Sequence, residues 1–314
     1  MPAAGAELPP LSLFPDSPGN ISLSLPVLGG QPREAVFSEV AASGESGVFA
    51  LFRSGAWLLG IASQTMPHDL EANTCRFYQE LFQAAHGYHL CRIWNYVPQI
   101  NALNKEGLEN YRAFSSGRSQ AFEQHFGRDF KCQLPSASAV GTDGSRLTVL
   151  FAASPHTPHH CENPSQVPAY DYPAKHGPRP PSFSRATVVP AGQGRADVFI
   201  SGTAAIKGHE TIAPGDTGAQ LDCTLENLRR ISCVAGLGDT LGAGQCAARH
   251  FKIYLRHAED YCAVAAALEQ RLLRPGDVAS YLRADICRAE LNVEIEATVL
   301  GSSLGSKHHT PQPI

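Results

Sequence analysis

The sequence predicts an α+β fold in which two similar β-α-β-α-β-β units follow one another along the chain. Three observations support this prediction. Strand-like and helix-like segments recur in the same order in both halves, a proline-rich stretch separates the halves, and each half closes with strand-like runs. We expect mixed sheets with the helices packed on one face of each sheet.

The first half combines buried-strand patterns with helical periodicity. Phe77, Tyr78, Leu81 and Phe82 recur at the spacing of one helix face. The predicted elements are a strand at 56–62, a helix at 70–85, a strand at 90–97, a helix through Tyr111, Phe114 and Phe122, and strands at 135–140 and 147–152.

The second half repeats this order, although few residues match between the halves, so the duplication is inferred from the order alone. Its predicted elements are a strand at 198–204, a helix through 221–231, a strand at 250–255, a helix through 264–272, and strands at 281–287 and 291–300.

Residues 155–181 form the predicted linker between the halves, because this stretch holds eight prolines and few large aliphatic residues. We assign residues 1–154 to an N-terminal unit and 182–314 to a C-terminal domain that carries most of the active site. His156, His159, His160 and Cys161 are metal ligands by type. They lie in a segment expected to be a solvated loop, so we predict no metal site.

Composition limits the class of protein. Of the 314 residues, 43% are hydrophobic and 17% are charged, which is enough apolar material for a core. The net charge of −4 favours neither nucleic acid nor a membrane surface as partner. No apolar run approaches the roughly 18–20 residues of a membrane span.

Residues 1–10 lack the positive start of a secretory signal. The nine cysteines are scattered along the chain, which is typical of reduced thiols. We therefore expect a cytoplasmic protein.

The closing segment 291–300 alternates with period two. Val293 and Ile295 fall on one face, whereas Glu294 and Glu296 fall on the other. Two carboxylates on one face of an apolar strand are costly unless that face meets water, cations or a ligand. The simpler interpretation is that the face carrying Glu294 and Glu296 is exposed to water.

The preceding segment 281–288 alternates too, and it places Arg283, Asp285 and Cys287 on one face. If the two segments pair as a hairpin, an arginine, a thiol and a carboxylate converge on one pocket. Such a set suits a substrate that bears carboxylates and undergoes a proton transfer.

These residues resemble two related groups of proteins. Residues 181–186, 198–204 and 293–297 are similar to the opening, the Ser-Gly strand and the Glu-Ile-Glu-Ala strand of the YjgF/Rid family. Across about residues 35 to 300 the chain more specifically resembles the chorismatases. The segments that carry this resemblance are 92–96, Asn101, Tyr111-Arg112, Phe114, Gly117-Arg118, 181–186, 208–211 and 282–288.

The resemblance implies YjgF/Rid-like, chorismate-mutase-like units and an enzyme that converts chorismate and releases pyruvate. One type of chorismatase forms a dihydroxycyclohexadiene carboxylate by net hydrolysis. Others form 3-hydroxybenzoate, or both 3- and 4-hydroxybenzoate. By resemblance Glu294 protonates the methylene of the enolpyruvyl group. Cys287 occupies a position where a cysteine accompanies the hydroxybenzoate-forming types, so hydroxybenzoate is the favoured product.

The substrate-binding residues also follow from the resemblance. Arg283 matches the carboxylate-binding arginine of YjgF/Rid proteins. Arg185 is a second candidate arginine, and Tyr172 is a candidate hydroxyl from the linker. The end of the Ser-Gly strand supplies the remaining candidates, since its glycine lets a ligand approach the backbone and its last residue lies where the types of chorismatase vary; they are Ser201, Gly202 and Ala204.

Other functions stay open. A Rid-like imine deaminase would use the same arginine and glutamate, but it leaves the N-terminal half unexplained. A non-catalytic binding module is the third alternative. No metal or organic cofactor is expected. YjgF/Rid proteins are commonly trimers, and two units per chain could replace part of that packing, so a monomer and a homotrimer are both open.

Overall fold

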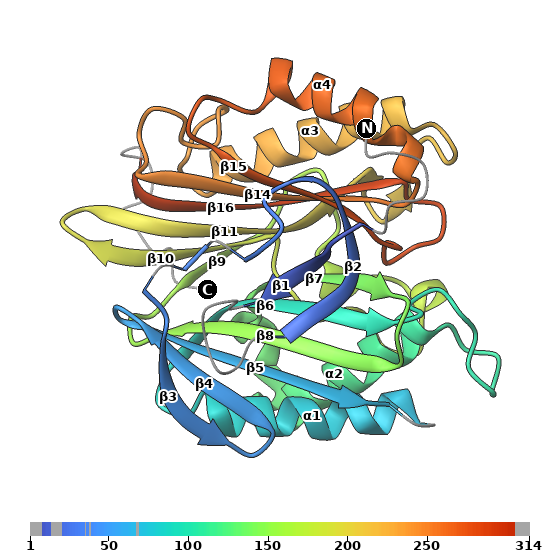
Figure 1. The fold of residues 1–314 in the computed structure, drawn as a ribbon. Helices are drawn as coiled ribbons and strands as arrows, with labels where there is room; N and C mark the ends of the chain where they lie inside the picture. Colours follow the sequence, from blue (N-terminus) through green and yellow to red (C-terminus); the bar gives the residue numbers. More distant parts are fainter. Residues whose placement is uncertain (1–7, 14–20, 35, 38, 67–68, 305–314) are drawn as a thin grey trace.

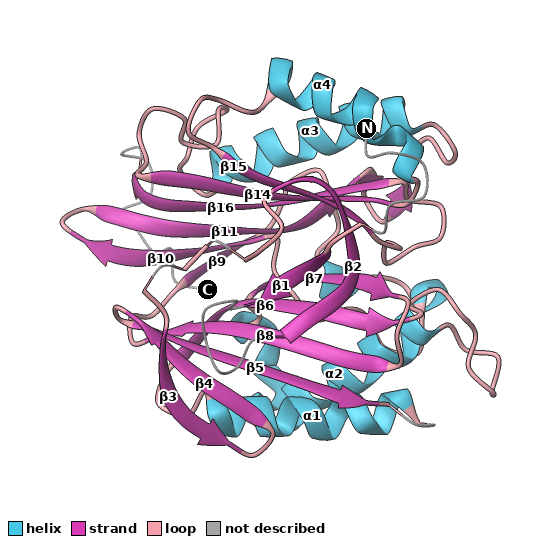
Figure 2. Ribbon diagram, in the orientation of Figure 1, coloured by secondary structure: helices cyan, strands magenta, loops and turns pink. Residues whose placement is uncertain are grey.

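The computed structural model describes residues 8–13, 21–34, 36–37, 39–66 and 69–304. Residues 1–7, on which the expectation of no secretory signal mainly rests, lie outside the described residues. Two sheets lie face to face in the middle of the molecule, and the helices cover their outer faces (Figures 1 and 2). Helices α1 and α2 cover one sheet, and α3 and α4 cover the other. The result is a four-layer α-β-β-α arrangement.

The first unit contains a six-stranded sheet in the order β3-β4-β5-β8-β6-β7. Its elements are β3 (Ala41–Ser46), β4 (Phe49–Ser54), β5 (Trp57–Thr65), α1 (Leu70–Ala84), β6 (His89–Pro98), α2 (Asn110–Phe126), the 3₁₀ segment Gly127–Gln133, β7 (Ser136–Thr142) and β8 (Arg146–Ser154).

The second unit contains an eight-stranded sheet in the order β1-β2-β15-β14-β16-β11-β10-β9. Its elements are β1 (Pro10–Leu13), β2 (Ile21–Gly30), β9 (His159–Cys161), β10 (Ala186–Gly192), β11 (Arg195–Ala204), α3 (Thr217–Val234), β14 (Ala248–Leu255), the 3₁₀ turn Ala258–Asp260, α4 (Tyr261–Arg271), β15 (Val278–Arg283) and β16 (Val293–Ser303). The short strands β12 (Ile206–Lys207) and β13 (Glu210–Thr211) pair with each other.

The two units have the same topology. The order β4-β5-β8-β6-β7 in the first sheet matches β10-β11-β16-β14-β15 in the second. In each unit the strands joined by the second helix are parallel, namely β6 with β7 and β14 with β15, and the other pairs of these ladders are antiparallel. The predicted fold class and the repeated β-α-β-α-β-β order are confirmed.

The first helix of each unit begins in the same way. Asp69 accepts a hydrogen bond from the backbone N–H of Ala72, and Asp216 accepts one from that of Ala219, both at 2.9 Å. These N-caps satisfy backbone donors that the first turn leaves unpaired. Beyond each cap, residues at helical spacing bury an apolar face against the sheet, such as Phe77 and Leu81 in α1.

The N-terminal strands β1 and β2 belong to the second sheet, where β2 pairs with β15. The expected assignment of residues 1–154 to one unit therefore differs from the structure, since residues 10–13 and 21–30 pack with the C-terminal unit. This pairing covers the edge of β15, which would otherwise present unpaired backbone groups.

The linker contains more structure than its prolines predict. Residues 159–161 form β9, which pairs with β10, and 3₁₀ turns occur at Ala169–Asp171 and Ala174–His176. The expectation of a solvated loop is wrong at β9. Cys161 is buried, and Nδ1 of His160 lies 3.1 Å from the hydroxyl of Thr187. The prolines that flank β9 are tolerated because this strand pairs over only three residues, at an edge of the sheet.

The described residues show neither a metal-binding cluster nor a membrane-spanning helix. Within the described ranges, no group of three or more His, Cys, Asp or Glu side chains is placed to hold a metal ion. Among the helices built from these same residues, none is both long and apolar enough to cross a membrane.

Candidate active site

A cavity of about 560 Å³ opens between the two units. Its walls come from α2 and β7 of the first unit, from the linker, and from β11, β16 and the segment before β16 in the second unit. This volume is within the range that holds a small organic ligand. The first unit and the linker contribute lining residues beside those of residues 182–314, which include Arg185, Cys287 and Glu294.

Glu294 lies on β16 at the inner end of the cavity, and its side chain is buried. Burial, and to a lesser extent the carboxylate of Glu296, raise the pKa of this carboxyl to about 8 against the opposing effect of Arg92 and Arg185. Its Oε1 has no hydrogen-bond partner among the described residues. At neutral pH Glu294 therefore carries a proton that it can donate into the cavity.

A β-bulge in β11 makes room for this carboxyl. Ile200 pairs with Ala297 and Thr203 pairs with Ile295, so β11 has one more residue than β16 between the two pairs. Gly202 lies in the bulge and faces Glu294, and a Cβ at this position would overlap Oε1. A glycine is therefore required for the glutamate to point into the cavity.

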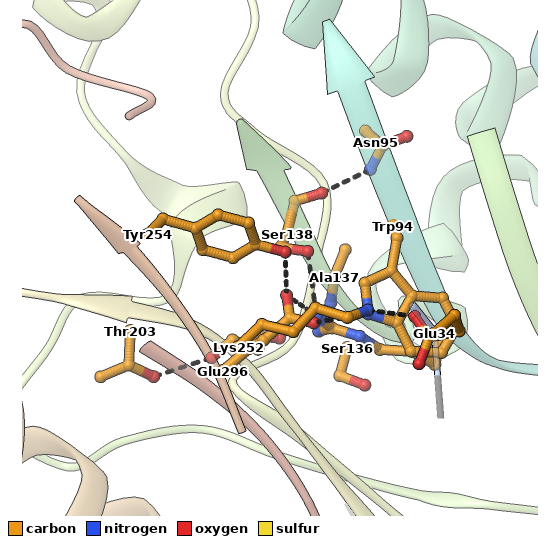
Figure 3. A network of polar contacts seen from close by, with 12 residues as sticks. Glu34, Trp94, Asn95, Ser136, Ala137, Ser138, Thr203, Lys252, Tyr254 and Glu296 are labelled. Carbon is orange, nitrogen blue, oxygen red and sulfur yellow. Dashed lines mark hydrogen bonds and ion pairs between the residues drawn. The ribbon is translucent and has the colours of Figure 1, made fainter. Parts of the chain in front are cut away.

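The second carboxyl on this face, Glu296, is also buried, so the solvated face considered from the sequence is wrong. Its Oε2 accepts a hydrogen bond from Arg92 at 2.6 Å, and its Oε1 accepts one from the indole of Trp94 at 2.7 Å. Figure 3 shows Trp94, Lys252 and Tyr254 gathered around this carboxylate between the sheets. These donors hold the pKa of Glu296 below its ordinary value although burial opposes them, so Glu296 is ionised.

Two buried arginines in the cavity wall have unused donors. Arg118 on α2 is 3% exposed, and its Nε and Nη2 have no hydrogen-bond partner within the described ranges. Arg185 is 5% exposed and donates to the hydroxyl of Tyr172 at 2.8 Å, while its Nε makes no hydrogen bond to any described residue. A buried guanidinium with free N–H groups is a site for a carboxylate ligand.

The linker and a third arginine close the outer part of the cavity. Arg288 donates to the backbone oxygen of His209 at 2.9 Å and to the hydroxyl of Thr211 at 3.2 Å. Its guanidinium lies over the ring of Tyr172, 5.4 Å from the ring centre. Tyr172 and Arg185, both substrate-binding candidates from the sequence, line this cavity.

Cys287 lies beside Glu294 in the segment 284–292, not on a strand. Burial and the charge of Glu294 raise the pKa of its thiol to about 12, so it stays protonated at neutral pH. Arg256 fixes this segment by donating to the backbone oxygens of Arg288 and Leu291, at 2.9 and 2.8 Å. Cys287 is therefore a neutral wall of the cavity rather than a nucleophile.

The structure does not bring Arg283 to this site. Its side chain is about one-third exposed and pairs with Asp143 at 3.2 Å, and Arg283 does not line the cavity that the described residues form. The expected hairpin is absent because β14 lies between β15 and β16, and because β15 ends at Arg283. Alternation with period two therefore stops before Cys287 and cannot be extended to it.

Ser201 is also displaced from the expected role, whereas Gly202 and Ala204 line the cavity. The Ser201 hydroxyl donates to the backbone oxygen of Ser184 at 2.6 Å and accepts from the backbone N–H of Ala137 at 2.8 Å. These bonds use the hydroxyl to join the two units, so Ser201 acts as a structural link in this structure.

Sequence reasoning did not identify Arg118 as a site residue, although a signal was present. Arg118 lies seven residues after Tyr111, four after Phe114 and four before Phe122, in the apolar stripe of one helix. An arginine in such a stripe is buried, and a buried arginine needs a counter-charge or a ligand.

Comparisons with known proteins agree with this architecture. The family described as "Chorismatase FkbO/Hyg5-like, N-terminal" matches residues 36–153. A chorismatase of Streptomyces rapamycinicus is 39% identical over 265 residues, which are 82% of this chain and 78% of the relative. A 3-hydroxybenzoate synthase of Streptomyces hygroscopicus is 41% identical over 217 residues, which are 67% of this chain but only 63% of that relative. A crystal structure of a chorismatase aligns with a TM-score of 0.75 at 30% identity and covers 95% of each chain.

The fold and the cavity together define an enzyme built from two stacked units of the same topology, with a protonated carboxyl and buried arginines between them. Given the identity and coverage of its relatives, the chain belongs to the chorismatase family.

The raised pKa of Glu294 predicts a pH-dependent effect on stability. The unfolded chain ionises this carboxyl near its ordinary value of 4.5, whereas the folded protein keeps the proton up to about pH 8. The stability that Glu294 contributes is thus complete below pH 4.5 and is lost as the pH rises toward 8. Glutamine does not titrate, so the melting temperature of Glu294→Gln minus that of the wild type should increase from pH 5 to pH 8. A constant difference would contradict a buried protonated carboxyl.

Proposed function

We propose that this protein converts chorismate to a hydroxybenzoate and pyruvate, with Glu294 as the acid. The observation that carries the proposal is one cavity that combines a carboxyl protonated at neutral pH with two buried arginines that have unused donors. Relatives named chorismatase and 3-hydroxybenzoate synthase support the choice of substrate and product.

The charges of the cavity suit a dicarboxylate such as chorismate. Arg118 lies on the wall from the first unit, and Arg185 lies on the wall from the second. Arg118 has both Nε and Nη2 without a hydrogen-bond partner among the described residues, so it can donate two hydrogen bonds to one carboxylate. Arg185, whose Nε lies 4.0 Å from Glu162 and whose Nη2 donates to Tyr172, adds a second positive charge for the other carboxylate. A dianion held at both ends would direct its ether group toward the part of the cavity where Glu294 and Gly202 lie.

The chemical step follows from the position of the acid. The enolpyruvyl group is an enol ether, and its methylene carbon accepts a proton from Glu294. This creates an oxocarbenium-like centre that weakens the bond between the ring carbon and the ether oxygen. When that bond breaks, its electrons return to the oxygen and pyruvate leaves. The ring then loses a proton and becomes aromatic, so that chorismate yields hydroxybenzoate and pyruvate without net consumption of water.

Cys287 is proposed to influence the product. Its neutral thiol lies beside Glu294 and limits the space next to the reacting ether. When the thiol of Cys287 fills this space, the ring hydroxyl is the group that captures the cationic intermediate. A smaller residue at this position would leave space for water. This favours hydroxybenzoate over the dihydroxycyclohexadiene carboxylate that net hydrolysis would form.

A Rid-like imine deaminase has less support than a chorismate-converting enzyme. That activity was expected to use Arg283, which pairs with Asp143 on the surface. It would also leave unexplained Arg118, which comes from the first unit.

Location and oligomeric state are also proposed. All nine cysteines are free thiols, which favours a cytoplasmic protein. The two units stack their sheets within one chain and so replace part of the packing between separate subunits, and we propose a monomer with the homotrimer as alternative. Light scattering of the purified protein distinguishes the two.

Glu294→Gln should reduce the rate of pyruvate release from chorismate by about 10²- to 10⁴-fold, because the amide keeps the shape but has no acidic proton. Pyruvate is measured by a coupled enzyme assay, and the aromatic product is identified by chromatography. Glu226→Gln, on the outer surface of α3, serves as the matched control and should keep the wild-type rate. Near-normal pyruvate release from Glu294→Gln would remove Glu294 as the acid.

Arg118→Gln should raise the KM for chorismate by roughly tenfold to a hundredfold, since a charged hydrogen-bonding partner of the substrate is lost. The free energy of unfolding should not fall, because the variant removes a buried cation whose Nε and Nη2 have no hydrogen-bond partner among the described residues. Arg283→Gln is the control and should leave KM unchanged. The opposite pattern, with KM raised only in Arg283→Gln, would return the carboxylate-binding role to Arg283.

A further inference from the structure

Arg92 on β6 pairs with Glu296 and is near enough to Glu294 to lower the pKa of that carboxyl. Its Nη2 donates to Oε2 of Glu296 at 2.6 Å and to the hydroxyl of Ser138 at 2.9 Å. Ser138 lines the cavity next to Glu294 and Gly202, so Arg92 approaches the acid from behind the cavity wall. Its Nη1 has no hydrogen-bond partner in the part of the chain that the structure describes.

Glu296 is held in place from both sheets. Besides Arg92, Trp94 of the first sheet donates to Oε1 at 2.7 Å. From the second sheet, the hydroxyl of Tyr254 donates to Oε2 at 3.2 Å, and Nζ of Lys252 lies 3.4 Å from Oε1. Figure 3 shows Trp94, Lys252 and Tyr254 converging on Glu296. With its carboxylate fixed in this way, Glu296 also fixes the guanidinium of Arg92.

We propose that Glu296 and Arg92 are positioning residues for Glu294: Glu296 binds the guanidinium of Arg92 and keeps it from pairing with Glu294, so that the cavity carboxyl remains a proton donor. This inference rests on the proposed role of Glu294 as the acid. It assigns a function to the second carboxylate of the closing strand, which does not line the cavity.

The balance of charges around Glu294 supports this role. The groups that face it are Glu296 on the same strand, Arg92 on β6, Arg185 before β10, Tyr254 on β14 and the thiol of Cys287. Glu296 favours the protonated form of Glu294, and Arg92 favours the ionised form. Because the two charges offset one another, burial decides, and Glu294 keeps its proton.

Two substitutions disturb this balance in opposite directions. Activity requires protonated Glu294, so kcat falls as the pH rises through its pKa. Glu296→Gln leaves the charge of Arg92 uncompensated beside Glu294, and the fall in kcat should move to lower pH by about one unit or more. Arg92→Gln leaves the charge of Glu296 facing Glu294, and the fall should move to higher pH by about one unit.

Asp277→Asn is the matched control, because it breaks another buried ion pair of the second unit, between Asp277 and Arg249. This variant should lose stability but keep the wild-type pH profile of kcat. Opposite shifts in Glu296→Gln and Arg92→Gln are the expected result. Two results would contradict the proposal and leave Glu296 and Arg92 with a structural role only. One is a pH profile of kcat that neither substitution shifts. The other is a shift in the same direction in both variants that Asp277→Asn also shows. In Arg92→Gln the carboxylate of Glu296 still has Lys252 beside it. If Glu296→Gln does not fold, the shift of the kcat profile in Arg92→Gln is therefore the test.

A second measurement separates this inference from the proposed function. The infrared band of the protonated Glu294 carboxyl, identified by its loss in Glu294→Gln, is titrated without substrate in the wild type and both variants. If wild-type protein releases no pyruvate from chorismate, the proposed function fails, but opposite shifts of this titration still support the positioning role. If pyruvate is released and the titration midpoints coincide, the positioning role alone fails.

Discussion

The ion pair between Arg92 and Glu296 joins the two units in the layer where their sheets meet, and the site is arranged around it. Both side chains are almost fully buried, at 1% and 6% exposed. Breaking such a pair by removing one partner typically costs about 3–5 kcal/mol, because an unpaired charge is left without water. The stacking of the sheets and the ionisation state of the site therefore depend on each other. The cavity can keep one carboxyl neutral because the neighbouring carboxylate already has its cation.

The duplication separates the chemical roles between two units of the same topology. The closing strand of the first unit, β8, presents Leu150 and Ala152 to the layer between the sheets, whereas β16 presents Glu294 to the cavity between the units and Glu296 to Arg92 and Trp94 of the first sheet. The first unit instead supplies Arg92 from a strand and Arg118 from a helix. The acid thus comes from the second unit, whereas Arg92 and Arg118 come from the first. A single unit would lack half of the cavity wall and the guanidinium that pairs with Glu296, which gives a physical reason for two units in one chain.

The sequence was most informative where one strand or one helix determined the pattern. The alternation of 291–300 predicted β16 and placed Glu294 on the face opposite Val293, because one covered face repeats every two residues. The prediction failed where a partner strand had to be chosen. Arg283 and Cys287 were joined by extending an alternation through a loop, and no local pattern shows that β14 separates β15 from β16. The hydroxyl of Ser201 accepts a hydrogen bond from the backbone N–H of Ala137, which only the stacking of the units brings near.

The central claim is that an acid of the protein delivers a proton to the methylene carbon of the substrate. The most direct measurement is turnover of chorismate in D₂O, followed by rapid quenching and mass spectrometry of the pyruvate formed. Glu294 exchanges its proton with solvent, so the account predicts that the methyl group of pyruvate gains one deuterium in a single turnover. A methyl group without deuterium would show that the hydrogen came from the substrate's own ring, and this result would contradict the account.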